Sequence, residues 1–364
     1  MPHPPTPLEN ARRRSADLLA EVHADPGRFR VVTGDRPTGP LHLGHLLGTL
    51  VNRVALQRDG VEVFVVIADH QVTTDRDDPG DVRGAVRDLL LDNLAAGLEP
   101  GPAERGGAAV FVHSAVPALH QVFVLLLGLV TEAELRRNPT VKAEAAAARA
   151  RPGGHRAVSG LLLTYPVHQA ADVLSCRGTL VPVGQDQLPH LEIARTVARR
   201  CNERFGGGGP VLVEPEPLLS PVPLLAGTDG RKMSKSAGNS IALRASEDET
   251  ARLVRSARTD AERRITFEPD RRPEVAALLV TAAACSGATP EAVAEEVGDG
   301  GAVRLKAVVT EAVNEHLRPL RRRRRELEGA DDHLRSVLAA GAERANEAAG
   351  GTVARVLEAM GLGV

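Results

Sequence analysis

Two histidines, His42 and His45, lie three residues apart with Gly44 between them, directly after a turn rich in glycine and proline. At that spacing both imidazoles occupy one face of the first turn of a helix. A helix that begins after a strand presents N–H groups that bind phosphate, and Gly44 leaves space for a purine or ribose beside the backbone. A single histidine at a helix start is usually a surface or capping residue, but this pair after this turn indicates a nucleotide site.

The turn itself, from Thr33 to Leu41, differs from two common phosphate-binding sequences. No Gly-Lys-Ser or Gly-Lys-Thr follows it, so it is not a Walker A loop. It also lacks the G-x-G-x-x-G pattern of dinucleotide-binding proteins. The imidazole pair therefore predicts a different way of holding the phosphates.

A cationic segment in the second half of the chain fits the same phosphates. It reads Arg231-Lys232-Met233-Ser234-Lys235-Ser236 and is flanked by glycine. Two lysines and two hydroxyls so close together form a clamp for the β- and γ-phosphates while negative charge develops on a leaving pyrophosphate. Two lysines at this spacing are usually part of a solvated loop, but the histidine pair elsewhere in the chain favours the nucleotide interpretation.

A third group of residues predicts a pocket for an aromatic molecule. Tyr165, Gln169 and Asp172 are spaced i, i+4 and i+7, so they line one face of a helix. A carboxylate at the floor of an apolar pocket accepts a hydrogen bond from a single donor, which can be an indole N–H or a tyrosine hydroxyl. Apolar residues flank Asp172 on both sides, which disfavours a position on the helix surface.

These groups need a framework, and the first two thirds of the chain alternate between strand and helix patterns. Apolar runs at residues 29–33, 61–68, 108–113 and 179–183 predict strands, and the periodic segments between them predict helices, including one at 131–149. From residue 247 onward nearly all of the chain is predicted to be helical. The fold class is therefore α/β, a Rossmann-like doubly wound parallel sheet with a C-terminal all-helical domain.

A composition shift near Gly230 divides the chain into three predicted parts. Residues 1–28 form an N-terminal extension. Residues 29–229 form the Rossmann-like domain, with a helical insertion around 117–156, and proline-rich connections fill residues 211–230. Residues 230–364 contain the lysine segment and the helical domain.

Bulk composition excludes several classes of protein. The 364 residues carry a net charge of −2, so contact with a polyanion depends on local patches. The three cysteines are far apart, which fits neither a disulfide framework nor a structural zinc site, and no metal site is predicted. The N-terminus lacks the apolar core of a signal peptide, and the longest apolar stretch, residues 122–130, is too short to span a bilayer. We expect a soluble protein of the reducing cytoplasm, without membrane contact.

Class I aminoacyl-tRNA synthetases have two signature sequences, which this chain resembles in His42-Leu43-Gly44-His45 and in Lys232-Met233-Ser234-Lys235-Ser236. The resemblance implies that ATP activates an amino acid, which is then transferred to the 3′ end of tRNA, usually to the 2′-hydroxyl. The helical domain would bind the tRNA anticodon.

Two further stretches, residues 163–174 and 180–192, resemble tryptophanyl-tRNA synthetases, and the resemblance extends from about Arg30 to the last residues. It implies that Asp172 binds the indole N–H, that Tyr165 and Gln187 bind the α-amino group, and that Gln169 lines the indole pocket. The residues it assigns to ATP are Arg36, Pro37, Thr38, Gly44, His45, Gly184, Gln185, Asp186, Lys232, Met233, Ser234, Lys235 and Ser236. The chain departs from the family at Arg36, where many members have Gln, and at Gln169, where many have Met.

The expected chemistry is alignment and charge stabilisation at the α-phosphorus of ATP, without a covalent enzyme intermediate. We assign His42 and His45 to the phosphate chain and Lys232 and Lys235 to the departing pyrophosphate. Mg²⁺ is expected to bind with ATP, because no carboxylate cage for it is apparent. The expected partners are L-tryptophan, tRNA(Trp) and a second copy of the chain, and no DNA.

Five consecutive arginines, residues 321–325, lie on a predicted helix. Contact with tRNA phosphates and a solvated face balanced by Glu326 and Glu328 explain them equally well.

Three rival interpretations remain. A tyrosyl-tRNA synthetase has the same chemistry with a different pocket, a non-charging relative would serve as a tRNA-binding or regulatory protein, and a related nucleotidyltransferase would share the histidine turn. The chain contains no Trp. Together with the two polar departures, this suggests an auxiliary, inhibitor-tolerant isoform made when charged tRNA is scarce. Expression that ignores tryptophan supply and synthetase inhibitors would refute that hypothesis.

Overall fold

The computed structural model describes residues 7–74, 78–150, 158–220, 225–231, 233 and 238–363. Its centre is a parallel five-stranded sheet in the order β3-β2-β1-β4-β5. The strands are β1 (Arg30–Asp35), β2 (Glu62–Ile67), β3 (Ala109–Val112), β4 (Leu180–Val183) and β5 (Glu216–Leu219). The order reverses between β1 and β4, which is where doubly wound folds bind ligands at the carboxyl ends of the strands. The predicted α/β fold class is confirmed.

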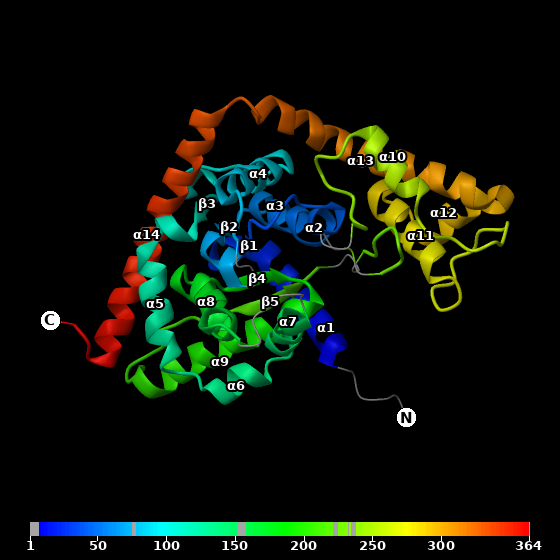
Figure 1. Cartoon of the computed structure of the whole chain (residues 1–364). Helices are drawn as coiled ribbons and strands as arrows, with labels where there is room; N and C mark the ends of the chain where they lie inside the picture. Colours follow the sequence, from blue (N-terminus) through cyan, green and yellow to red (C-terminus); the bar gives the residue numbers. More distant parts are fainter. Residues whose placement is uncertain are drawn as a thin grey trace.

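Helices cover both faces of this sheet (Figure 1). Side chains along β2 alternate between two cores, with Val63 and Val65 in one and Phe64 and Val66 in the other. The first core also contains side chains of α3 (Val51–Arg58) and α4 (Val82–Ala95). The second contains side chains of α5 (Pro117–Leu127), α8 (Gly160–Ser175), α9 (Leu188–Phe205) and α14 (Asp331–Met360). Strands buried on both faces explain the continuous apolar runs in the sequence.

The helix predicted after the first strand begins at Leu43 as α2 (Leu43–His45), widens into a π-helical turn, η2 (Leu46–Leu50), and continues as α3. The single helix predicted at 131–149 is wrong. Two helices, α6 (Glu132–Arg137) and α7 (Pro139–Ala150), occupy that range. Asn138 separates them, because its side chain accepts hydrogen bonds from the backbone of Thr140 and Val141 and because proline at 139 cannot continue a helix.

Two elements were not predicted. Helix α1 (Pro7–Ala24) lies inside the predicted extension, and its buried residues Ser15, Leu18 and Val22 follow helical spacing. Strand β5 lies in the stretch predicted to be proline-rich connections. It is the edge strand of the sheet, where a proline such as Pro217 is tolerated because one side needs no backbone donor.

From Glu247 onward the described chain is mostly helical, with α10 (Glu247–Arg255), α11 (Pro273–Ser286), α12 (Pro290–Val297), α13 (Gly301–Leu327) and α14. The segment 256–272, between α10 and α11, is irregular, so the helical prediction fails there. Short 3₁₀ turns complete the fold: η1 (Pro26–Arg28), η3 (Asp69–Thr74), η4 (Ala103–Arg105), η5 (His113–Ala115), η6 (Gln185–Gln187) and η7 (Gly298–Gly300). Helix α14 returns along the sheet and packs against β3 and α5 (Figure 1). The three-part division of the chain stays a prediction.

The arginine run on α13 divides into two kinds of side chain. Arg321 and Arg324 are buried, whereas Arg322, Arg323 and Arg325 are exposed. Arg324 forms a 2.6 Å ion pair with Asp88 of α4, and Arg321 donates a 2.8 Å hydrogen bond to Thr250 of α10. These two arginines are neither a tRNA contact nor part of a solvated face, because they attach α13 to α4 and α10.

Among the described helices, none alone has the length and hydropathy needed to cross a membrane. Only α11 joined to the segment Pro290–Leu327 across a 107° bend reaches those limits, by length and composition alone.

Helix α14 can approach β3 closely because Gly341 has no side chain. A Cβ at this position would collide with the backbone carbonyl of Val110, which cannot move aside as a side chain can. We expect Gly341→Ala to lower the free energy of unfolding by about 1–3 kcal/mol. Gly350 of the same helix has open space where a Cβ would be added. Gly350→Ala should therefore be neutral or stabilising by up to about 1 kcal/mol. Thermal and chemical denaturation of both variants measure the difference, and equal stability would contradict the packing described.

Candidate active site

The site is assembled where four parallel strands end. Arg36, Pro37 and Thr38 follow β1, and Gly184 follows β4 on the other side of the point where the strand order reverses. Asp69 follows β2, and His113 follows β3. Because all strands run in the same direction, these residues share one edge of the sheet.

The histidine pair has the predicted placement at the start of a helix. His42 is buried, and its ring centroid lies 3.7 Å from that of His45. The backbone N–H of His42 donates a 3.2 Å hydrogen bond to Nδ1 of His45. That bond makes Nδ1 the acceptor, so the neutral His45 ring carries its proton on Nε2.

The histidine turn is attached to the chain that follows the lysine segment. Leu43 donates a backbone hydrogen bond to Ile241, and Leu243 donates one to Leu41, both at 2.9 Å. Met233 is buried, and its sulfur lies 3.5 Å from the place that a Cβ on Gly44 would take. The two segments therefore meet, as the sequence predicted.

The other predicted residues of the lysine segment, Lys232, Ser234, Lys235 and Ser236, lie outside the described residues. On the turn after β4, Gln185 is exposed, Gln187 is half-buried, and Asp186 lies between them in η6.

Helix α8 carries the predicted aromatic pocket. Tyr165 is buried, and its hydroxyl lies 3.2 Å from Nε2 of His190. Burial and the nearby Glu144 carboxylate raise the pKa of Tyr165 well above its usual range, while the charge of Arg36 acts in the opposite direction. Arg36 and Tyr165 therefore lie close enough to interact across the sheet edge. Gln169 is half-buried one turn further along α8.

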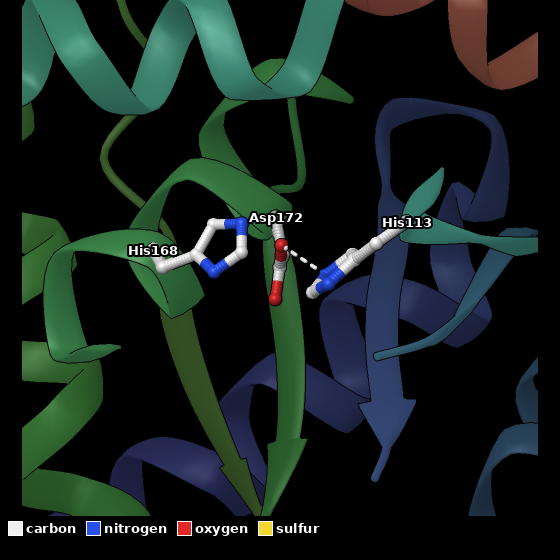
Figure 2. Close-up of side chains that lie close together, drawn as sticks. All are labelled: His113, His168 and Asp172. Carbon is white, nitrogen blue, oxygen red and sulfur yellow. Dashed lines mark hydrogen bonds and ion pairs between the residues drawn. The ribbon is translucent and has the colours of Figure 1, made fainter. Parts of the chain in front are cut away.

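Asp172 is 5% exposed, so the alternative that it is a surface charge is wrong. One of its oxygens, Oδ1, lies 2.8 Å from Nε2 of His113, and Figure 2 shows this contact. A carboxylate accepts, so Nε2 of His113 carries the proton. Burial lowers the pKa of the fully enclosed His113, but the charge and hydrogen bond of Asp172 outweigh it and the pKa is raised.

Three more histidines extend this contact into a cluster that sequence reasoning missed. His70, His120 and His168 lie with His113 at ring-centroid distances of 4.7 to 6.1 Å. They come from η3, α5 and α8, so no sequence spacing joins them. The available signal was the position of His70 and His113 just beyond predicted strands, at the edge where ligands bind.

Hydrogen bonds fix the tautomers of two of these rings. The ring of His120 lies 3.2 Å, through Nε2, from the backbone carbonyl of His113, so Nε2 is the donor. Nδ1 of His120 is then an acceptor for Nε2 of His168, also at 3.2 Å. Burial lowers the pKa of His120 and lowers that of His168 to about 4, so both rings are neutral near pH 7. The proton of His168 is on Nε2, and Nδ1 keeps a lone pair.

The arrangement supports a defined chemistry. The imidazole pair and Met233 of the lysine segment lie together at the start of a helix, where a phosphate chain can bind. The buried carboxylate of Asp172 can accept one further donor from an apolar molecule. Such a site can join a nucleotide to a second substrate that carries a ring N–H.

Comparisons with known proteins show to which family this fold and sequence are similar. The family model described as "tRNA synthetases class I (W and Y)" matches residues 25–318. The tryptophan–tRNA ligase of Treponema pallidum is 40% identical over 347 residues, covering 92% of this chain and 97% of that protein. The tryptophanyl-tRNA synthetase of Mycoplasma pneumoniae superposes with a TM-score of 0.78 at 27% identity, covering 92% of this chain and 98% of that one. The Campylobacter jejuni enzyme, solved with ADP and tryptophan, gives 0.75 at 27% identity, covering 92% and 100%.

The tautomers of the histidine cluster can be tested directly. Two-bond ¹⁵N–¹H correlation spectra of ¹⁵N-histidine-labelled protein at neutral pH should show His120 and His168 protonated at Nε2 and unprotonated at Nδ1. Exposed His333 serves as the control and should show averaged tautomers. A proton on Nδ1 of either ring would contradict the hydrogen-bond chain.

Proposed function

The chain belongs to the class I tRNA synthetases for tryptophan and tyrosine, and we propose that the cleft at the carboxyl ends of β1 and β4 carries out the tryptophan reaction of this family. The chain is an ATP-dependent aminoacyl-tRNA synthetase that ligates tryptophan to tRNA. The observation that carries the proposed site is the meeting of the histidine turn with Met233 and with residues 241–243.

The first step is adenylation, which needs no general base because the carboxylate of tryptophan is already ionised. A carboxylate oxygen attacks the α-phosphorus of ATP, and the bond between that phosphorus and the bridging oxygen of pyrophosphate breaks. Tryptophanyl-adenylate and pyrophosphate result. The 2′- or 3′-hydroxyl at the end of tRNA then attacks the activated carbonyl, and AMP leaves. The protein contributes alignment and stabilisation of the charge that moves onto pyrophosphate.

We assign the charge stabilisation to His42 and His45 and to Lys232 and Lys235. The histidines are supported by their shared position at the start of a helix, where N–H groups also point toward the phosphates. The lysines are supported by their neighbour Met233, which packs beside Gly44. The place that a Cβ on Gly44 would take lies 3.1 Å from the His42 ring and 3.5 Å from the Met233 sulfur, so the missing side chain lets both groups lie against the backbone. Further ATP contacts are proposed for the residues after β1 and β4, namely Arg36, Pro37, Thr38, Gly184, Gln185 and Asp186, and for Ser234 and Ser236.

The tryptophan side chain would enter the pocket under α8. Oδ1 of Asp172 is engaged by His113, so Oδ2 is the oxygen proposed to accept the indole N–H. Tyr165 and Gln187 would contact the α-amino group, and Gln169 would line the pocket. Tyrosine has no ring N–H, and its hydroxyl lies further from Cα than the indole nitrogen of tryptophan does. Asp172 would therefore favour tryptophan over tyrosine, because only the indole N–H is at the right distance.

Mg²⁺ is proposed to arrive with ATP as part of the substrate. Within the described chain, the residues that bring three potential metal ligands together are His113, His168 and Asp172. Two imidazoles do not suit Mg²⁺, which prefers oxygen ligands and retains water. When bound to ATP, the ion neutralises phosphate charge.

We also propose that the chain works as a homodimer and that tRNA phosphates contact the exposed Arg322, Arg323 and Arg325. These three side chains project from α13, whose buried Arg321 and Arg324 hold it in place. A long rigid helix with exposed guanidinium groups suits contact with a phosphate backbone.

The reaction is tested by ATP–pyrophosphate exchange with each amino acid in turn. Tryptophan should support exchange. Tyrosine should support it with a kcat/KM at least about 100-fold lower, because its hydroxyl does not occupy the position of the indole N–H beside Asp172. Exchange that prefers tyrosine, or exchange with no amino acid, would contradict the proposal.

The role of Asp172 is tested by Asp172→Asn. The amide keeps the size of the side chain but removes the charge, so kcat/KM for tryptophan should fall about 10- to 100-fold, as expected for a hydrogen bond to a charged group. The KM for ATP should change by less than about threefold, because Asp172 is assigned to the tryptophan side chain and not to ATP. The matched control is Asp332→Asn on the surface of α14, which should leave both parameters unchanged. An equal effect on ATP would argue against the assignment.

A further inference from the structure

His113, His168 and Asp172 form a cluster of potential metal ligands, and the proposed adenylation requires no metal there. Each of the three side chains offers one ligand atom, and these atoms lie within 4.8 Å of one another. All three residues are buried, with exposed fractions of 0%, 3% and 5%. Figure 2 shows the carboxylate of Asp172 between the two imidazoles. Two imidazoles and one carboxylate form a common ligand set for a catalytic-type zinc ion, which keeps a fourth position open.

The second observation is an unsatisfied lone pair. Among the described residues, Nδ1 of His168 and Nδ1 of His113 have no hydrogen-bond partner, although both are enclosed. The hydrogen bond from Nε2 of His168 to His120 leaves Nδ1 of His168 as an unprotonated acceptor pointing into a dry region. A buried acceptor without a donor is costly, and a cation relieves that cost.

The second shell also fits a metal site. Nδ1 of His120 accepts a hydrogen bond from Nε2 of His168, and Nε2 of His120 donates one to the backbone carbonyl of His113, which holds the rings of His120 and His168 in fixed orientations. Metal-binding histidines typically use their other nitrogen in this way. His70, which stacks on His120 with ring centroids 4.7 Å apart, is exposed and marks a path from solvent.

We propose that His113, His168 and Asp172 bind a single Zn²⁺ ion, and that the ion and tryptophan exclude one another because both use the Asp172 carboxylate. Zinc–ligand bonds of about 2.0–2.2 Å place ligand atoms roughly 3.3 Å apart, so the widest pair here must close by about 1.5 Å, which rotation of Asp172 or His168 can supply. The exclusion of tryptophan rests on the proposed function, whereas the zinc site itself does not. A synthetase with this site would be inhibited by free zinc.

Zinc binding is measured by equilibrium dialysis of the full, chelator-stripped chain, with metal analysis of both compartments. We expect one equivalent of bound Zn²⁺, and His168→Gln should weaken binding at least 100-fold, because the amide is close to the ring in size but is a much weaker zinc ligand than an imidazole nitrogen. The matched control is His333→Gln on the surface of α14, which should bind zinc as the unchanged chain does. Saturating tryptophan should weaken zinc binding, and zinc should weaken tryptophan binding by the same factor.

Binding that is absent, that survives His168→Gln, or that ignores tryptophan would overturn the inference. If His168→Gln does not fold, the visible spectrum of Co²⁺ bound to the unchanged chain replaces the variant. A spectrum of four-coordinate Co²⁺ with nitrogen and oxygen ligands, lost when tryptophan is added, supports the site. A spectrum like that of Co²⁺ in water overturns it. The two proposals fail in different ways. A chain that activates tryptophan but binds no zinc refutes only this inference, whereas one that binds zinc but activates no tryptophan contradicts the proposed function.

Discussion

Two backbone hydrogen bonds, from Leu43 to Ile241 and from Leu243 to Leu41, fix the histidine turn against the second half of the chain. They join two stretches that are distant in the sequence, the histidine turn and residues 241–243, which follow the lysine segment. Asp92 strengthens this joint, because it accepts a hydrogen bond from the backbone of Leu41 and lies 3.2 Å from Nε of Arg324. The position of α13 is thereby linked to the histidine turn. A rigid link of this kind suits an enzyme whose catalysis depends on alignment.

The second constraint is the burial of charge beside the substrate pocket. An ionised carboxylate away from water is unfavourable unless it is paired and hydrogen-bonded. Nε2 of His113 donates a hydrogen bond to Oδ1 of Asp172. The charge of Asp172 and this hydrogen bond raise the pKa of His113 despite its burial. The remaining oxygen is then available to a ligand. In the proposed function, substrate selection would depend on this half-satisfied carboxylate, because a pocket with an unpaired acceptor rejects molecules that lack the matching donor.

The sequence predicted the parts of the molecule that depend on local pattern. Apolar runs and helical periodicity gave the parallel sheet, and the spacing of Tyr165 and Asp172 placed both on α8. Three features required knowledge of the tertiary fold. Strand β5 tolerates Pro217 only because it is at the edge. The buried roles of Arg321 and Arg324 depend on partners in other helices. The histidine cluster draws on three separate segments, whose proximity follows from the strand order and from no spacing in the chain.

The central claim, that this cleft charges tRNA with tryptophan, is tested most directly by aminoacylation. The chain is incubated with ATP, tRNA(Trp) and labelled tryptophan, and acid-precipitable label is counted against a parallel reaction with labelled tyrosine. We expect tryptophan to accumulate on tRNA in an ATP-dependent way and tyrosine to remain at background. Label that enters tRNA from tyrosine alone, or from neither amino acid in a chain that is folded, would contradict the account.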